Sequence, residues 1–316
     1  MKPLVAILGP TATGKSALGI AIAQRFDGQI INCDSTAVYR GFDIGTDKPP
    51  MDARGGIPHH LIDIADPTDE YTAAQYGRDA AAVVRDLHAR GKLPILVGGT
   101  GFYYRALTRG LFPGPGKDAD LLARLERIAQ KKGVEALHRL VARVDPDSAL
   151  RIQPRDRKRL VRALEVYFQT GRPLTAHFDQ TVSPLDKDVK VTPLALRMPA
   201  PWLADRLARR VDEQFEAGLL AEIRRLLASG VPPTARPFGG LVYRQAMDYL
   251  QGVRDEAATR ALIAQENRRY ARRQLIWFRK EPSLVWFEGP GTSPDVQDSV
   301  ISWLIEQGPL RLSKTA

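Results

Sequence analysis

The 316-residue sequence contains a single cysteine, Cys33, and no long hydrophobic run. One thiol excludes an intrachain disulfide framework, which suits a reducing cytoplasm. Apolar runs such as residues 4–8 fall far short of the roughly 20 residues that a membrane-spanning helix needs. The first residues show no extended apolar stretch with a small-residue cleavage site, so we expect no signal peptide. These absences predict a cytoplasmic protein without a membrane partner.

Internal repeats and low-complexity segments are also lacking, but positive charge is abundant. Lys and Arg number 46 against 36 Asp and Glu, which gives a net charge of +10 and a pI near 9.8. Residues 117–281 carry +11 of net charge, whereas residues 1–116 carry only +1. Such a surplus makes a nucleic acid the first partner to test, with an ordinary basic enzyme as the alternative.

Short apolar segments alternate with helical patterns in the first third of the chain. Because alternating strands and helices build a parallel sheet covered on both faces, we expect an α/β fold. One helix pattern begins at Thr72, a suitable N-cap, and stops at Gly91. The expected strands span residues 4–8, 29–34, 59–64 and 93–99, and the expected helices span residues 15–25 and 72–90.

The pattern of alternating strands and helices ends at the Pro-Gly-Pro-Gly run at residues 113–116. Residues 118–170 carry only helical patterns. We therefore predict a core formed by residues 1–115 and 190–316, with a helical insertion at residues 116–189. Later strands are expected at residues 191–198 and 284–288. Long amphipathic stretches cover residues 202–229 and 256–280, and a last helix is expected at residues 295–307.

Residues 9–16 match the phosphate-loop pattern G-x-x-x-x-G-K-[ST] at every fixed position. The motif follows an expected strand and opens an expected helix, which is the context that the pattern requires. Glycines let backbone N–H groups point into one concavity, and the helix N-terminus adds its positive dipole end. Lys15 then reaches the outer phosphates, and Ser16 can ligate Mg²⁺. The predicted phosphate-binding residues are Gly9, Pro10, Thr11, Ala12, Thr13, Gly14, Lys15 and Ser16.

The sequence lacks the acid that motor and switch ATPases place at the end of a second long apolar strand. The strand at residues 93–99 runs into Thr100 instead, and an acid comes earlier, at Asp34. Because ligands bind outside the carboxyl ends of parallel strands, we expect residues 9–16, Asp34 and Thr100 to converge. This pattern suits a small-molecule kinase or another group transferase that handles a phosphorylated donor.

Asp34 is the candidate general base, since a carboxylate beside a cationic phosphate site stays ionised and accepts a proton. The alternative is that Asp34 caps the next turn. Thr46 and Lys48 follow in a polar loop, where a binding role and a solvated loop are equally supported.

The first of two arginine-rich helical patterns spans residues 155–171. It places Arg155, Arg159 and Arg162 on one helix face. Arginine is the favoured side chain for gripping phosphate, but the same row also fits a solvated face.

The second pattern, at residues 267–280, is more specific. Its arginines form two i,i+4 pairs without a compensating acid on that face, and an apolar ridge lies opposite. Like charges at this spacing repel, so an anionic partner is the economical explanation. Tyr270, Trp277 and Phe278 could stack on bases, although core positions are more usual for such side chains.

Six segments, taken in order, resemble the tRNA dimethylallyltransferase family, also called tRNA isopentenyltransferases. They cover nearly the whole chain and are together far more specific than the phosphate loop alone. The segments are GPTATGKS (9–16), INCDS with VYRGFDIGTDKP (31–49), PHHLID (58–63), LVGGTGFY (96–103), RLVRALEVY (159–167) and RRYARRQLIWFRK (268–280).

The resemblance implies that a dimethylallyl group is transferred from dimethylallyl diphosphate to N6 of an adenosine beside the tRNA anticodon, with Mg²⁺ assisting release of diphosphate. It implies a P-loop NTPase-like core with an inserted helical domain, in which the motif otherwise typical of ATP binding holds the prenyl diphosphate. Asp34 would accept the N6 proton, while Thr100 and Arg162 would steady the leaving diphosphate. The tRNA-binding residues that it implies are Asp34, Ser35, Thr36, Ala37, Thr100, Lys158, Arg159, Leu160, Val161, Arg162, Tyr243, Arg244, Arg268, Arg269, Arg272 and Arg273.

The sequence departs from the family pattern at two places. Thr36 and Ala37 are small where the family often has a long or polar side chain, and Val242 stands where Gly is common. Prenylation of free adenine nucleotides, a small-molecule kinase and a non-enzymatic RNA-binding protein are the alternatives. We expect a monomer, and the set of tRNAs and the prenyl chain length stay open.

Overall fold

The computed structural model describes residues 1–310 and divides into two compact units. The core unit is built from residues 1–108 and from residue 184 onward, and the insertion unit is built from residues 109–183. The borders lie a few residues before those expected from the sequence. Within the insertion unit the incoming and outgoing chain segments touch, because a Cβ on Gly110 would lie 2.0 Å from the Val182 carbonyl oxygen.

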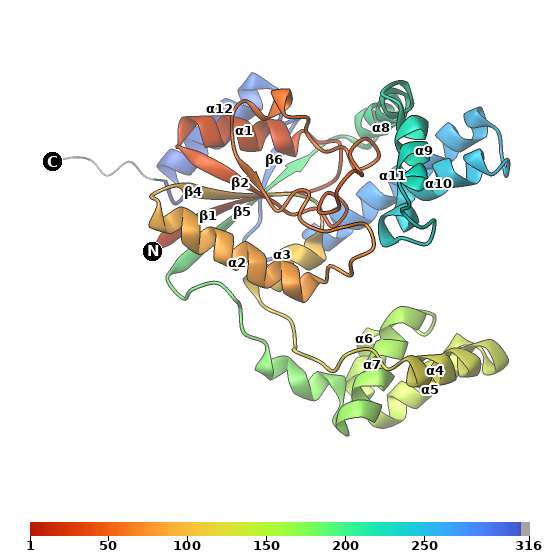
Figure 1. Ribbon diagram of the computed structural model, residues 1–316. Coiled ribbons are helices and arrows are strands. Elements are labelled where there is room, and N and C mark those ends of the chain that lie inside the picture. The colour runs from red at the N-terminus through yellow and green to blue at the C-terminus, as the bar shows by residue number, and fades with distance from the viewer. Residues whose placement is uncertain (311–316) are drawn as a thin grey trace. The chain divides into compact units, whose positions relative to one another are not determined.

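Six parallel strands form the sheet of the core unit, in the order β3-β2-β4-β1-β5-β6 (Figure 1). Side chains of β1 alternate between the two faces, so that Leu4 and Leu8 join one hydrophobic cluster and Val5 and Ile7 join another. The strands are β1 (Lys2–Leu8), β2 (Gly28–Asn32), β3 (His59–His60), β4 (Leu93–Val97), β5 (Val189–Arg197) and β6 (Val285–Glu288).

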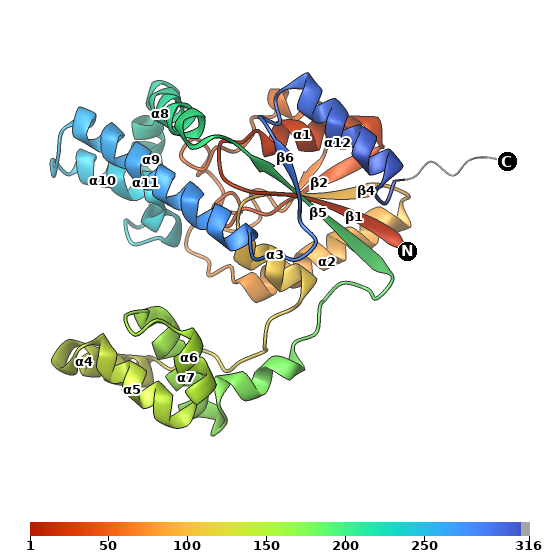
Figure 2. The same cartoon turned by 180° about the vertical axis from the view of Figure 1, so that it is seen from behind.

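Helices cover both faces of this sheet (Figures 1 and 2). Leu18 and Val300 pack against one face, and Tyr76 and Val84 pack against the other. The predicted parallel sheet covered on both faces is therefore confirmed. The first face carries α1 (Lys15–Arg25) and α12 (Pro294–Glu306), and the second carries α2 (Ala73–Ala89) and α3 (Gly101–Thr108).

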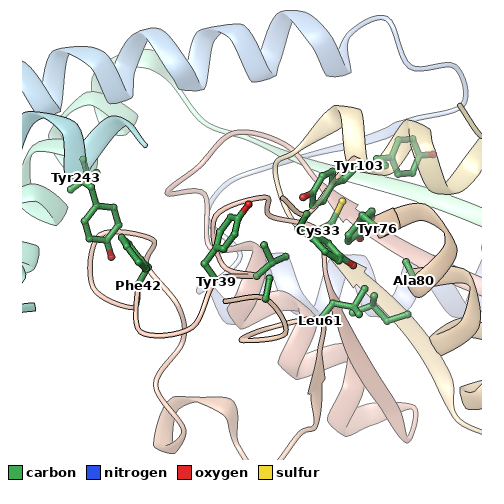
Figure 3. Packing of buried hydrophobic residues seen from close by; sticks show 14 of the residues in the cluster. Cys33, Tyr39, Phe42, Leu61, Tyr76, Ala80, Tyr103 and Tyr243 are labelled. Atoms are coloured by element: carbon green, nitrogen blue, oxygen red, sulfur yellow. The ribbon is translucent and has the colours of Figure 1, made fainter. Parts of the chain in front are cut away.

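Four further helices of the core unit follow β5 in the chain, and the largest cluster of buried side chains includes residues from them. Figure 3 shows Phe42 and Tyr243 of this cluster, whose ring centroids lie 4.9 Å apart. The amphipathic stretch expected at residues 202–229 forms two helices, because Gly218 adopts a φ of 95° and separates them. The four helices are α8 (Ala200–Glu216), α9 (Leu219–Ala228), α10 (Leu241–Leu250) and α11 (Glu256–Phe278).

The insertion unit is helical and has its own small core, in which Leu137, Leu160 and Leu164 are fully buried. The expected absence of strands from residues 118–170 is confirmed. Among the helices formed by residues 1–310, none combines the length and the apolar character needed to cross a membrane. The helices of the insertion unit are α4 (Ala119–Lys132), α5 (Val134–Val144), α6 (Pro146–Arg151) and α7 (Arg157–Thr170).

Candidate active site

The phosphate loop connects β1 to α1 and is held from outside by the β6–α12 connection. Gly14 has a φ of 84°, and a Cβ at this position would lie 2.8 Å from the Gly291 backbone nitrogen. The Gly291 N–H donates to the Thr13 carbonyl oxygen over 2.9 Å. The second fixed glycine of the motif is therefore required both by the left-handed backbone and by the close approach of another chain segment.

The side chain of Lys15 returns to the phosphate loop, where its Nζ donates to the Pro10 carbonyl oxygen over 2.5 Å. Burial lowers the pKa of Lys15 to about 7, and repulsion from Arg210 adds to this shift. Asp34 opposes it, so the two side chains are close enough to interact electrostatically. Lys15 and Arg210 thus bring two cationic groups to the phosphate loop, and such a site favours a phosphate or diphosphate.

Arg210 of α8 is a part of this site that the sequence did not indicate. Its guanidinium donates to Thr11 Oγ1 over 3.0 Å and to Asp47 Oδ2 over 2.9 Å. Gln214, one turn further along α8, donates to Asp47 Oδ1 over 2.9 Å. Burial raises the pKa of Asp47, and Arg210 opposes that rise. Asp47 thus fixes the guanidinium beside the phosphate loop.

Asp34 lies just beyond the end of β2, where Asn32 and Thr36 hold it. The Asn32 amide donates to the Asp34 carbonyl oxygen over 3.0 Å, and the Asp34 N–H donates back over 3.1 Å. Asp34 Oδ1 accepts from the Thr36 N–H and hydroxyl over 2.8 and 2.6 Å, so the alternative in which Asp34 caps the next turn is confirmed for this oxygen. Within residues 1–310 no hydrogen bond to Oδ2 is recorded. One carboxylate oxygen therefore orients the group and leaves the other available as an acceptor.

Thr100 lies beside Asp34, as the strand-end argument predicts. Its N–H donates to the Cys33 carbonyl oxygen over 3.1 Å, and its Oγ1 accepts from the Ser35 N–H over 3.1 Å. A Cβ on Gly98 would lie 2.2 Å from the Cys33 carbonyl oxygen, which explains why a glycine precedes this contact. The ends of β2 and β4 are thus joined directly, and Asp34 and Thr100 share one site.

Helix α11 supplies two more groups to this site from its inner face. Gln274 hydrogen-bonds to both the phosphate loop and the end of β4. Tyr270 bonds to Thr100, while burial and then the Asp34 charge raise the pKa of the phenol. Both residues lie far from the phosphate loop in sequence. The signal that could have found Gln274 is a polar residue on the buried ridge that includes Ala271 and Phe278.

Tyr243 was expected at the RNA interface, but its side chain is only 2% exposed. Its hydroxyl donates to Glu222 Oε1 over 2.6 Å and accepts from the Gly45 N–H over 3.0 Å. Glu222 Oε2 also accepts from the N–H groups of Asp43 and Ile44. Tyr243 therefore holds the loop at residues 43–45, and the expectation that its side chain contacts RNA is wrong for this conformation.

Two other residues implied for RNA contact have side chains that are not accessible. Ala37 is 5% exposed and packs in the core unit, and Leu160 is fully buried within the insertion unit. Only their backbone groups could serve a partner. Lys48, which the sequence left undecided, is a structural residue: its ammonium bonds to the Tyr39 carbonyl oxygen and to Asp63 over 2.6 Å each.

The arginines of α11 lie on its exposed side, but one part of the expectation needs correction. Glu266 lies on the same helix and pairs with Arg269 at 3.2 Å and with Arg244 at 3.3 Å, so a compensating acid is present. Arg273 stacks on Tyr270, with 5.6 Å from the guanidinium carbon to the ring centroid. Arg268 and Arg272 complete the set that the resemblance implies for RNA contact, and within residues 1–310 neither side chain forms an ion pair.

The remaining implied residues, from Lys158 to Arg162, belong to α7 of the insertion unit. Arg162 donates to Glu165 Oε2 over 2.6 Å and to the Pro115 carbonyl oxygen over 3.2 Å. Arg159 pairs with Asp156 at 3.4 Å, while Lys158 is exposed. Their assignment to RNA or diphosphate stays a prediction.

A divalent ion would have few protein ligands in this site. Within residues 1–310 no cluster of three or more His, Cys, Asp or Glu side chains is arranged to hold a metal. Ser16 is exposed in the first turn of α1, next to Lys15. A hydroxyl in this position fits Mg²⁺, which commonly binds through one or two protein oxygens together with substrate phosphates and water.

Comparison with known proteins agrees with this geometry. The sequence model of a family described as "IPP transferase" matches residues 37–281. The chain is 46% identical over 303 residues to a tRNA dimethylallyltransferase of Solibacter usitatus, covering 95% of this chain and 97% of the relative. It is 43% identical over 300 residues to that of Geobacter metallireducens, with the same coverage.

Solved structures are similar over nearly the whole chain. A crystal structure of the full-length tRNA isopentenylpyrophosphate transferase of Bacillus halodurans has a TM-score of 0.70 and 34% identity, covering 97% of this chain and 98% of that one. A eukaryotic dimethylallyltransferase, described as acting on tRNA, has a TM-score of 0.80 and 28% identity, covering 96% of this chain and 78% of that one.

Proposed function

The chain belongs to the IPP transferase family, which includes the tRNA dimethylallyltransferases, and from this premise we propose that it prenylates tRNA. The reaction transfers a dimethylallyl group from dimethylallyl diphosphate to N6 of an adenosine next to the anticodon, and it releases diphosphate. The observation that carries the proposal is the convergence of the phosphate loop, the Asp34 carboxylate and Thr100 at adjoining strand ends.

The donor end of the site stabilises the charge that develops on the leaving group. As the allylic C–O bond breaks, negative charge accumulates on diphosphate, and preorganised N–H groups with Lys15 and Arg210 face it. Binding of diphosphate favours the charged form of Lys15, whose pKa is about 7 in the unliganded protein. Mg²⁺, held by Ser16 and the diphosphate, would supply further positive charge at the departing oxygens.

The acceptor end supplies a base. An exocyclic adenine amine is a weak nucleophile, so its proton must be accepted as the new C–N bond forms. Asp34 Oδ2 is suited to accept it, because Thr36 and Asn32 fix the carboxylate and its backbone without occupying that oxygen. The adenine must leave its stack to reach an enclosed carbon, which is easiest in a single-stranded loop.

The exposed arginines of α11 are the main RNA contact that we propose for the core unit. Arg268 and Arg272 lie on the exposed side of α11, and Tyr270 and Gln274 bring its inner face to the candidate active site. Phosphate contacts of this kind place an anticodon stem-loop without reading its sequence. We further propose that the protein acts as a monomer in the cytoplasm, where its tRNA substrate is found.

The decisive experiment replaces the base. Wild-type protein, dimethylallyl diphosphate, Mg²⁺ and unmodified tRNA should give a prenylated adenosine, which mass spectrometry of nucleosides detects. Asp34→Ala should lower kcat by roughly 10²- to 10⁴-fold, the range for loss of a general base, while tRNA affinity changes by less than about threefold. Thr36→Val, which removes only the hydroxyl that contacts Oδ1, is the control and should cost far less. Absence of product from wild type would refute the proposed function, and equal losses in rate and affinity would refute the base role.

A further inference from the structure

The inner face of helix α11 contacts the candidate active site, but no residue on it has a role in the proposed chemical steps. Three polar side chains, Thr259, Asn267 and Gln274, are buried on this face among apolar residues. Gln274 is the most unusual, because it is 5% exposed and both ends of its amide are hydrogen-bonded to loops that precede it by more than 170 residues. A buried amide that joins two remote loops restricts their separation.

The two loops are those that would hold the reacting groups. Gln274 Oε1 accepts from the Thr11 N–H of the phosphate loop over 2.9 Å, and Nε2 donates to the Gly99 carbonyl oxygen over 2.9 Å. Thr11 follows β1, and Gly99 immediately precedes Thr100 at the end of β4. These strands are neighbours in the sheet, but their ladder ends at Ile7 and Val97. Beyond that register the Gln274 amide bridges them.

The glycine at position 99 fits this arrangement. A Cβ there would lie 2.2 Å from Gln274 Nε2, so any other residue would displace the amide. On the same face of α11, Trp277 packs so closely on Gly101 that a Cβ would lie 2.4 Å from its ring. The glycines on either side of Thr100 therefore allow α11 to pack closely against this loop, and Gln274 makes the polar contact between them.

We propose that Gln274 is a positioning residue that fixes the spacing between the phosphate loop and Thr100, and thereby the alignment of donor diphosphate with Asp34. Gln274 itself touches neither substrate. The inference rests on the proposed function, since it concerns the same site. Its physical basis is that misplacing reacting groups by about 1 Å costs on the order of 10²-fold in rate.

The test compares Gln274→Met, which keeps the length of the side chain and removes both hydrogen bonds, with Gln265→Met at an exposed position of the same helix. For Gln274→Met we expect kcat to fall by about 10²-fold, the KM for anticodon stem-loop RNA to change by less than about twofold, and the affinity for Mg²⁺-pyrophosphate to fall by about tenfold. Gln265→Met should match wild type in all three. A lowered melting temperature with kcat and pyrophosphate affinity within twofold of wild type would show a packing role only and overturn the proposal.

A double-mutant cycle keeps the proposal testable if Gln274→Met folds poorly. Gly99→Ala should be about as damaging as Gln274→Met in the wild-type background, and much less damaging in a Gln274→Ala background that leaves room for the methyl group. Additive effects would refute the contact as the source of the loss. If the wild-type protein prenylates no tRNA, the proposed function fails, and pyrophosphate affinity across the same cycle still decides the role of Gln274.

Discussion

Helices α7 and α11 carry the two arginine-rich patterns of the sequence, yet their guanidinium groups are used differently. In α7, Arg162 is bonded to Glu165 and a backbone carbonyl oxygen, and Arg159 is paired with Asp156. In α11, Arg268 and Arg272 are exposed, and no partner for either is recorded within residues 1–310. The comparison teaches that arginine spacing alone does not identify an RNA-binding face, because the nearest acid decides whether the charge is available.

The largest expected effect is a loss of stability when the ion pair between Arg162 and Glu165 in α7 is removed. Glu165 is only 3% exposed, so Arg162→Ala would leave a buried carboxylate without its partner. We expect the free energy of unfolding to fall by about 2 kcal/mol, less than for a fully buried pair because Arg162 is partly exposed. Urea unfolding of the full chain, followed by circular dichroism, measures this.

The companion variant carries Arg162→Met and Glu165→Met together. It removes both charges, and most of the lost stability should return. If the double variant regains stability but prenylates slowly, Arg162 has the diphosphate role that family resemblance implies. A single variant as stable as wild type would show that the pair contributes little and would weaken the contrast with α11.

The next effect concerns the free charges of α11. Arg268→Ala with Arg272→Ala should weaken tRNA binding by about tenfold at moderate salt and reduce the slope of log K against log salt by roughly 1 to 2. The matched pair in α7 is Arg157→Ala with Arg159→Ala, whose guanidinium groups pair with Glu126 and Asp156. It should change the slope by less than about 1. Filter binding over a salt series measures both slopes. A larger change in slope for the α7 variant than for the α11 variant would contradict the difference between the two helices.

The pH dependence of diphosphate binding distinguishes the contribution of Lys15 from that of arginine, because Lys15 changes charge near pH 7. Lys15 has a pKa of about 7 in the unliganded protein, so it is charged below that pH and neutral above it. Because bound diphosphate favours the charged form, affinity for pyrophosphate should be highest below about pH 7 and fall by up to about tenfold per unit above it. Calorimetry on Lys15→Met gives the ligand's own titration for subtraction. Arg162→Met should leave the shape of the profile unchanged, and a flat wild-type profile would contradict the assignment.

The smallest expected effect is a gain in affinity for tRNA. Glu266 pairs with Arg244 and Arg269 on the exposed side of α11. Glu266→Gln should free both guanidinium groups and tighten tRNA binding by about two- to threefold, since exposed pairs contribute little to stability. Binding at low salt would show this gain, and weaker binding would mean that Glu266 instead orients the arginines.

Sequence reasoning found the features whose signal is local. The phosphate loop, the Thr72 cap of α2 and the strand-end position of Asp34 are each encoded within a few residues, and all appear where the sequence placed them. Tyr243 shows where the family resemblance misleads. The resemblance implied an RNA contact for this residue, but Glu222 and Gly45 bind its hydroxyl in the core.

The missed residues of the site act over long separations in sequence. Arg210 reaches Thr11 across 199 positions, and Gln274 reaches it across 263. Neither residue type nor spacing near position 210 or 274 reveals the partner. Only the sheet order, in which β1 lies between β4 and β5, brings the later helices to the loop that follows β1.

The close approach of Gly14 and Gly291 has a consequence for how the protein is made. The phosphate loop is among the first segments to leave the ribosome, but the amide that donates to Thr13 is at residue 291 and follows nearly all of the chain. β1 also pairs with β5 in the sheet, and β5 is synthesised only after the whole insertion unit. During synthesis, therefore, a nascent chain carries the motif long before it has the site, and competence to bind diphosphate should arise abruptly as the last strand and helix emerge.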